Sequence, residues 1–261
     1  MRLDKFLAQS LAEKRKDIRV YVKDGMIKVN GKVVVKPAIE INEKSDIIEY
    51  LGEVVKYSEK LYYMFNKPAG CITAKVDAIN KTVFDYFDDV KMKGLFHVGR
   101  LDKDTEGLLL LTNDGEFEHR LMHPRNHVKK TYFFWALGCL SEEDIKQLEQ
   151  GISIGKDGPL TKPAKIKLEK SGSYKYFKDG ISNEHLKYIK PNQHNQLVIS
   201  GYLTISEGRK HQVKRMLKAV GCYVIYLKRV SVGELILDES LKKGEHRMLK
   251  DIELKKLLVS T

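Results

Sequence analysis

The chain has 261 residues, enough for one large domain or for a small domain followed by a larger one, and its 42% hydrophobic content permits a substantial core. Lysine and arginine total 47 against 35 acidic residues, and this formal charge of +12 favours a polyanionic partner, with nucleic acid ahead of an acidic membrane surface. The three widely spaced cysteines exclude a disulfide framework, and no apolar run of about 18 residues suits a membrane span.

Residues 1–57 are predicted to form a small separate unit. Its first helix is predicted from apolar residues at helical spacing, Leu3, Phe6, Leu7 and Leu11. A second helix is expected over 16–23. A β-hairpin is expected over 26–35, because Asn30-Gly31 between two apolar runs is a strong turn signal. Residues 47–50 are expected to complete the sheet.

Two short motifs in this unit are informative about its partner. They are Arg2-Leu3-Asp4-Lys5-Phe6-Leu7 and Gly25-Met26-Ile27-Lys28-Val29-Asn30-Gly31, which flank a basic second helix. Together they resemble an S4 RNA-binding domain, in which a basic helical face lies against structured RNA. The resemblance makes candidate RNA contacts of Arg2, Lys5, Arg15, Lys16 and Arg19. A solvated helix face is the alternative interpretation of these charges.

The polar and charged residues 52–60 are predicted to link this unit to a second domain over 58–261. The expected strands are 61–65, 108–112 and 131–137, and the expected helices are 141–150 and 209–220. Ser141 with Asp144 resembles a helix N-cap. Because strands and helices interleave without a regular βαβ period, the predicted class is α+β, with a largely antiparallel mixed sheet flanked by helices. The polar residues 171–196 are expected to form an extended loop or insertion.

Residues 99–115 form a glycine-bracketed turn that runs into an apolar strand, Gly-Arg-Leu-Asp-Lys-Asp-Thr-Glu-Gly-Leu-Leu-Leu-Leu-Thr-Asn-Asp-Gly. A carboxylate at the start of a buried strand is costly unless a cation is close, so Asp102 is a candidate catalytic group. A structural turn aspartate is the alternative. A calcium loop is excluded because Asn113 stands at the twelfth position, where a bidentate glutamate is needed. No metal is expected.

The candidate cation comes from the predicted helix 209–220. Its apolar stripe consists of Val213, Met216, Leu217 and Val220. Lys214 flanks this stripe, where its ammonium group can reach an inward carboxylate. Arg215 is the second choice, although Arg215 and Lys210 are expected to meet solvent or phosphate. An ordinary basic surface helix is the alternative.

Four segments then extend the resemblance to nearly the whole chain: residues 65–70, 99–111, 130–132 and 206–216. Their motifs resemble those of the pseudouridine synthases of the RsuA type, which modify bacterial ribosomal RNA. The resemblance implies that Asp102 is the catalytic carboxylate, that Lys214 is its cation and that Tyr132 stacks on the uracil. It also makes candidate RNA contacts of Arg100, Arg209, Lys210 and Arg215. From its position alone, a place in the core or on the sheet surface is the more common role for a tyrosine such as Tyr132.

The implied reaction is isomerisation of uridine to pseudouridine in ribosomal RNA, without a cofactor. Within the family, the segment Gln212–Met216 is most similar to enzymes acting on 16S rRNA in the small subunit. A 23S rRNA enzyme and a non-catalytic RNA-binding ribosome-assembly factor are the alternatives. We expect a cytoplasmic monomer that acts on an assembling subunit and has no membrane partner.

Overall fold

The computed structural model describes residues 1–261 except 12, 57–59, 88–93, 156–157, 178–195 and 260–261. The chain divides into two units. The first consists of Met1–Tyr62, Phe87–Phe96 and Leu111–Gly115, and the second of Tyr63–Tyr86, His97–Leu110 and Glu116–Thr261.

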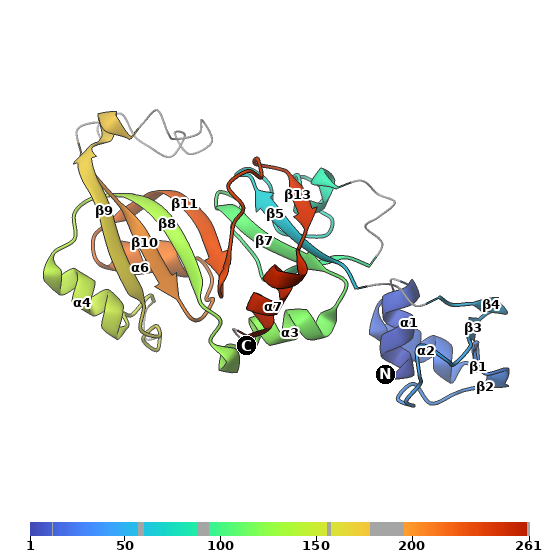
Figure 1. Cartoon of the computed structure of the whole chain (residues 1–261). Helices are drawn as coiled ribbons and strands as arrows, with labels where there is room; N and C mark the ends of the chain where they lie inside the picture. Colours follow the sequence, from blue (N-terminus) through green and yellow to red (C-terminus); the bar gives the residue numbers. More distant parts are fainter. Residues whose placement is uncertain (12, 57–59, 88–93, 156–157, 178–195, 260–261) are drawn as a thin grey trace. The chain divides into compact units, whose positions relative to one another are not determined.

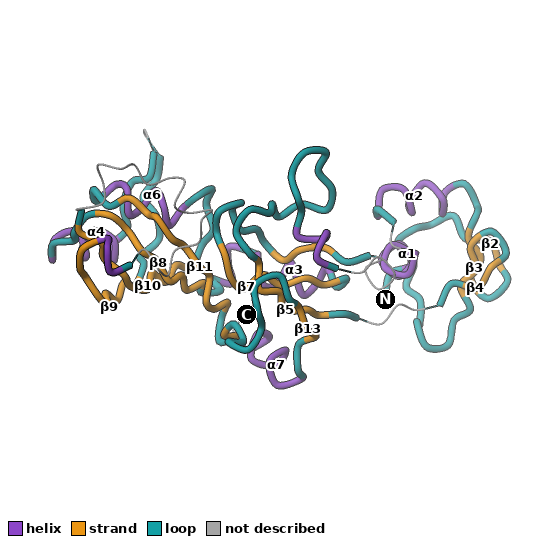
Figure 2. The backbone as a smooth tube through the Cα atoms, turned by 90° about the horizontal axis from the view of Figure 1, so that it is seen from above, coloured by secondary structure: helices purple, strands orange, loops and turns teal. Residues whose placement is uncertain are grey.

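The first unit places two helices beside a small antiparallel sheet (Figure 2). Its elements are α1 (Leu3–Leu11), α2 (Arg15–Lys23), β1 (Ile27–Val29), β2 (Lys32–Val33), β3 (Ile48–Tyr50) and β4 (Glu53–Val54), with strand order β2-β1-β3-β4. The predicted turn is present, and Asn30 and Gly31 both have positive φ, 50° and 76°, as a two-residue hairpin turn of the primed type requires. Buried apolar residues of both helices and the sheet form the core, among them Leu3, Phe6, Ile18 and Ile48.

One part of the predicted linker is wrong. Residues 53–54 form β4, whose backbone pairs with that of β3 at Glu49 and Tyr50. Strand pairing depends on the backbone, so the polar composition of this segment did not reveal it.

The larger sheet has nine strands among the described residues (Figure 1). They are β5 (Tyr62–Lys67), β6 (Phe96–Val98), β7 (Glu106–Thr112), β8 (Lys130–Leu137), β9 (Lys165–Ser173), β10 (Leu197–Ile205), β11 (Tyr223–Val232), β12 (Leu235–Ile236) and β13 (His246–Met248). The order is β13-β5-β7-β11-β8-β10-β9, with β12 on β11 and β6 on β7. β7 and β11 are parallel, whereas β8, β10 and β9 pair antiparallel, which confirms the α+β class.

The helices of the second unit are α3 (Gly115–Met122), α4 (Glu142–Gln150), α6 (Gln212–Ala219) and α7 (Asp251–Val259), with short 3-10 turns at Val83–Tyr86, Pro124–Asn126 and Tyr174–Tyr176. α4 begins as predicted, with a capping box between Ser141 and Asp144. Leu148 of α4 and Met216 and Leu217 of α6 join one core with residues of β8 and β10. α4 and α6 therefore cover the same sheet region (Figure 1).

The helix predicted over 209–220 begins later than expected, at Gln212. His211 adopts left-handed geometry with φ 53° at the N-cap position, which ends the preceding loop and starts α6. This conformation is uncommon for a residue other than glycine, and the residue pattern gave no sign of it.

The prediction of a loop over 171–196 is wrong for its first residues. β9 extends to Ser173 because Ser171 and Gly172 pair with Ile199 and Val198 of β10. Tyr174 is then buried in an apolar cluster. Residues 178–195 lie outside the described part of the chain.

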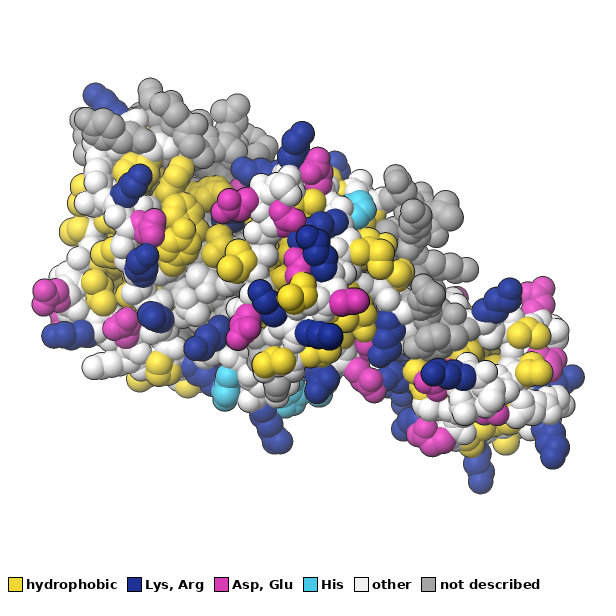
Figure 3. Space-filling model, in the orientation of Figure 1, with side chains coloured by type: hydrophobic (Ala, Val, Ile, Leu, Met, Phe, Trp, Pro, Cys, Tyr) yellow, Lys and Arg dark blue, Asp and Glu magenta, His cyan; other side chains and the backbone are white. Residues whose placement is uncertain are grey.

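On the face shown in Figure 3, basic side chains are interspersed with acidic ones and do not form a single patch. The net charge therefore does not by itself mark a binding face, which has to be identified from specific side chains. Within the described ranges, the helices include none with both the length and the hydropathy of a membrane span.

Candidate active site

A buried lysine holds the loop that carries Asp102. Lys67, at the end of β5, has no exposed surface, and its ammonium donates to the carbonyl oxygens of Asp102 at 3.0 Å, Lys103 at 3.3 Å and Thr105 at 2.9 Å. It also donates to the carbonyl of Pro68. Burial lowers the pKa of Lys67. Four carbonyl dipoles thus replace the water that a buried ammonium would lose, and they fix the backbone of the loop.

Two further contacts fix the same loop. The Thr73 hydroxyl donates to the carbonyl of Leu101 at 2.8 Å and accepts from its amide at 3.1 Å. Gly107 has φ +99°, and a Cβ there would lie 2.2 Å from the carbonyl oxygen of Arg229. Only glycine permits this approach of β7 to β11, so the glycine of the motif sets the position of the turn before it.

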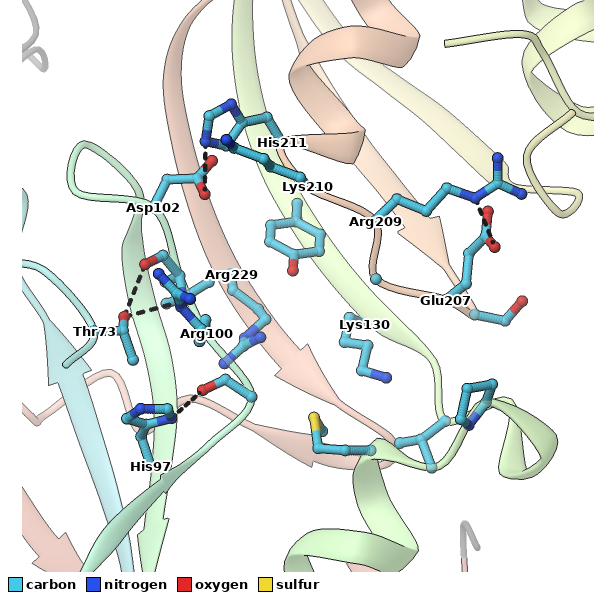
Figure 4. Close-up of a pocket in the computed structure, with 18 of the residues that line it drawn as sticks. Thr73, His97, Arg100, Asp102, Lys130, Glu207, Arg209, Lys210, His211 and Arg229 are labelled. Carbon is cyan, nitrogen blue, oxygen red and sulfur yellow. Dashed lines mark hydrogen bonds and ion pairs between the residues drawn. The ribbon is translucent and has the colours of Figure 1, made fainter. Parts of the chain in front are cut away.

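The structure brings Asp102 and Lys214 together, although not as a simple pair. The Lys214 ammonium is 3.6 Å from Asp102 Oδ2 but 2.5 Å from Asp104 Oδ1. His211 Nε2 lies 3.6 Å from Asp102 Oδ1 (Figure 4). The predicted cation therefore lies near Asp102, and it shares its charge with a second carboxylate, Asp104.

Sequence reasoning missed Asp104 and His211. The spacing of Asp104, two residues after Asp102 in the same turn, was a usable signal because both side chains leave one short loop. His211 had no such signal, since its position depends on the left-handed N-cap of α6.

The Asp102 side chain is 29% exposed and lines a cavity of about 960 Å³. Other predicted site residues that line the same cavity are Arg100, Tyr132, Arg209 and Lys210. The Tyr132 ring, on β8, is half-buried and packs against the core cluster beneath α6. A carboxylate, an aromatic ring and several cations thus share one solvent-accessible space.

Arg209 is held by its neighbours in the cavity wall. Its guanidinium donates to the carbonyl oxygens of Pro159 at 2.7 Å and Leu160 at 2.6 Å, and it pairs with Glu207 at 3.2 Å. These bonds tie the loop before α6 to residues 159–160, so much of the donor capacity of Arg209 is used within the protein.

Arg215 lies apart from this cavity. With Asp104, Lys214 and Lys218 it lines a second cavity of about 230 Å³. The structure therefore places Lys214, and not Arg215, against Asp102.

In the first unit, three predicted RNA contacts converge on one carboxylate. The Asp4 side chain is fully buried and accepts from Arg2 at 3.0 and 3.1 Å, from Arg15 at 2.9 Å and from Arg19 at 3.1 Å. Burial acts to raise the pKa of Asp4, but the hydrogen bonds from the arginines outweigh it and lower that pKa. The three guanidiniums remain about half exposed, which leaves donors for a ligand.

The other two predicted contacts differ in exposure. Lys16 on α2 is exposed, whereas Lys5 on α1 is half-buried.

Comparisons with known proteins show what the chain is similar to. The family model described as RNA pseudouridylate synthase matches residues 61–219, and the S4 domain model matches residues 1–48. An uncharacterized RNA pseudouridine synthase, YtzG of Bacillus subtilis, is 43% identical over 97% of each chain. The ribosomal small subunit pseudouridine synthase A of Haemophilus influenzae is 34% identical over 99% of this chain and 100% of that protein. A crystal structure of a pseudouridylate synthase superposes with a TM-score of 0.63, at 33% identity over 98% of this chain and 99% of that one.

Proposed function

Because the chain belongs to the RNA pseudouridylate synthase family, we propose that it isomerises a uridine of 16S ribosomal RNA to pseudouridine. The resemblance seen in the motifs is confirmed, and the chain is an RNA pseudouridine synthase whose substrate is RNA. The 16S assignment is supported by the full-length similarity to a protein named for the small ribosomal subunit.

The reaction is an internal rearrangement. The bond between ribose C1′ and uracil N1 breaks, the base turns, and C5 joins C1′ while C5 loses a proton and N1 gains one. No redox partner or group donor is needed. The target nucleotide must leave its stack, which costs a few kcal/mol, and the cavity of about 960 Å³ beside Asp102 can admit it.

One observation carries the proposal: a partly exposed carboxylate, Asp102, lines this cavity with Lys214 near one of its oxygens and His211 near the other. Both groups lie 3.6 Å away, so neither closes off the oxygens to a reactant. Addition to the nucleotide and removal of a ribose proton are both open to such a carboxylate, and both need the same charge and the same access.

The remaining residues have supporting roles in the proposal. The uracil stacks on Tyr132, and Arg100 and Lys210 contact the RNA backbone or fill the space that the flipped base leaves. Arg2, Arg15, Arg19, Lys5 and Lys16 of the S4 domain supply salt-dependent affinity for structured RNA. Arg209, with its carbonyl partners, chiefly shapes the cavity wall.

The test is to incubate the purified protein with 16S and 23S transcripts and with partly assembled small subunits, and then to map pseudouridine. Asp102→Asn is the inactive control. We expect one modified position in 16S rRNA that is absent with the control. Modification confined to 23S rRNA would overturn the 16S assignment, and the absence of pseudouridine from both RNAs would overturn the function.

We also propose that the protein acts as a cytoplasmic monomer. Its three cysteines are free, which fits a reducing compartment. Sedimentation at micromolar concentration and cell fractionation would check the two statements.

A further inference from the structure

Two cations of the large cavity, Lys130 and Arg229, are buried without a carboxylate beside them. The exposed fraction of Lys130 is 9% and that of Arg229 is 3%. Arg229 Nε donates to the carbonyl of Leu108 at 2.7 Å, and no ion pair involves either residue within the described part of the chain. Figure 4 shows both side chains extending from neighbouring strands into the cavity that Asp102 lines.

The strand register places these cations beside the proposed stacking ring. Lys130 and Tyr132 are two residues apart on β8, so their side chains leave the same face about 7 Å apart. Arg229 on β11 is the direct cross-strand partner of Tyr132, which puts it on that face as well. An aromatic ring and two cations thus form one array on the wall of the cavity.

The acidic groups of the cavity are engaged elsewhere. Asp102 faces Lys214 and His211, and Glu207 binds Arg209 and Gln212. Glu118, from α3, also lines the cavity, and within the described residues no ion pair joins it to Lys130 or Arg229.

Burial and the charge of Arg229 together lower the pKa of Lys130 to about 8. Two like charges held this way are unfavourable in the free protein, and an anionic ligand that enters the cavity would relieve the repulsion.

We propose that Lys130 and Arg229 form a subsite for a phosphodiester group of RNA, that of the nucleotide whose base stacks on Tyr132. The inference rests on the proposed function, because it takes RNA as the occupant. A guanidinium fork and an ammonium are the donors best suited to phosphate oxygens.

The test uses Lys130→Met in the full chain, which keeps the packed aliphatic stem and removes the charge. We expect the slope of log Kd against log salt for the 16S transcript to fall by about 1, the loss of one phosphate contact. Lys130→Arg should keep the wild-type slope. Lys146→Met, an exposed lysine of α4 outside the cavity, is the matched control and should also keep it.

Thermal unfolding separates a binding role from a structural one. In phosphate-free buffer, Lys130→Met should raise Tm by about 2–4 °C because it removes the repulsion. Inorganic phosphate should raise the Tm of the wild type more than that of the variant. A lower Tm together with an unchanged salt slope would overturn the subsite. If Lys130→Met does not fold, Arg229→Gln makes the same test, with the same expected fall in slope.

The outcomes distinguish the two proposals. A protein that makes pseudouridine, and whose salt slope and phosphate response are the same in Lys130→Met, retains the function and loses the subsite. A protein that makes no pseudouridine, and whose slope still falls in the variant, retains the anion subsite and loses the function.

Discussion

The two units each contain an aspartate surrounded by cations, and the two surroundings differ. Asp4 in the first unit is fully buried and accepts hydrogen bonds from three guanidiniums on both oxygens. Asp102 in the second unit is 29% exposed, with Lys214 and His211 each 3.6 Å away. Similar residue types thus produce a saturated carboxylate in one place and an accessible one in the other.

The difference lies in the oxygen lone pairs. Those of Asp4 are used by the protein, so its charge organises three arginines and has nothing left for a ligand. Those of Asp102 have Lys214 and His211 at 3.6 Å and stay open to a reactant. The short contact of Lys214 is with Asp104. This contact holds the ammonium near Asp102 without covering the Asp102 oxygens. A carboxylate that reacts with a substrate needs oxygen lone pairs that the protein's own donors do not fully occupy.

The largest expected effect comes from removing the open carboxylate. Asp102→Asn should lower turnover by at least about 10³-fold, because the amide has no charge to react or to accept a proton. RNA affinity should remain close to that of the wild type, since the S4 domain and the other cations are untouched. Single-turnover pseudouridine formation and filter binding measure the two effects. Asp251→Asn, an exposed aspartate at the start of α7, is the control that should change neither. Near-normal turnover in Asp102→Asn would contradict its assigned role.

Removing the saturated carboxylate should affect stability and not chemistry. Asp4→Asn removes the negative charge that three guanidiniums share and turns one of their acceptor oxygens into a donor, so it should destabilise the first unit by about 3 kcal/mol. A domain this small has little reserve, so we expect early unfolding of residues 1–55 in hydrogen exchange. RNA affinity should fall with it. Asp24→Asn, an exposed residue of the same unit, should unfold like the wild type. Equal protection in both variants would show that the arginine cluster is not structural.

Features that depend on adjacent residues could be predicted from the sequence, and features that depend on distant partners could not. The turn at Asn30-Gly31 and the cap at Ser141 depend on adjacent residues, and both were predicted. The α+β class followed from the order of the elements. β4 was missed because it forms by backbone pairing with β3 and has no strand pattern of its own. The start of α6 was missed because His211 takes a rare backbone conformation.

The site divides in the same way. Asp102, Tyr132 and Lys214 carried motif signals, whereas the second carboxylate beside Lys214 and the buried pair Lys130 and Arg229 emerge only when strands and loops meet. Charge alone could not rank these lysines and arginines, because burial and hydrogen bonding decide which are available.

A smaller effect should come from the ring beside the open carboxylate. Tyr132→Ala removes the stacking surface and should weaken RNA binding by about 1–3 kcal/mol. Tyr132→Phe keeps the ring and should bind RNA as the wild type does, so any fall in its turnover reports on the hydroxyl. Titrations of both variants in the Asp102→Asn background measure binding without turnover. Equal weakening by the two substitutions would mean that the hydroxyl, and not the ring, holds the RNA.

The smallest effect, and the most specific to the saturated carboxylate, is the response to acid. The pKa of Asp4 is lowered in the folded protein below its ordinary value of 3.8. The stabilisation from its ionised form is therefore fully present above the unfolded value, and it is lost as the pH falls from about 4 through the lower folded pKa. Asp4→Asn cannot titrate, so the stability difference between wild type and variant should shrink as the pH falls from 4 toward 2. Hydrogen exchange of residues 1–55 at several pH values measures that difference. A difference that stays constant over this range would show that the carboxylate contributes through its shape and not through its charge.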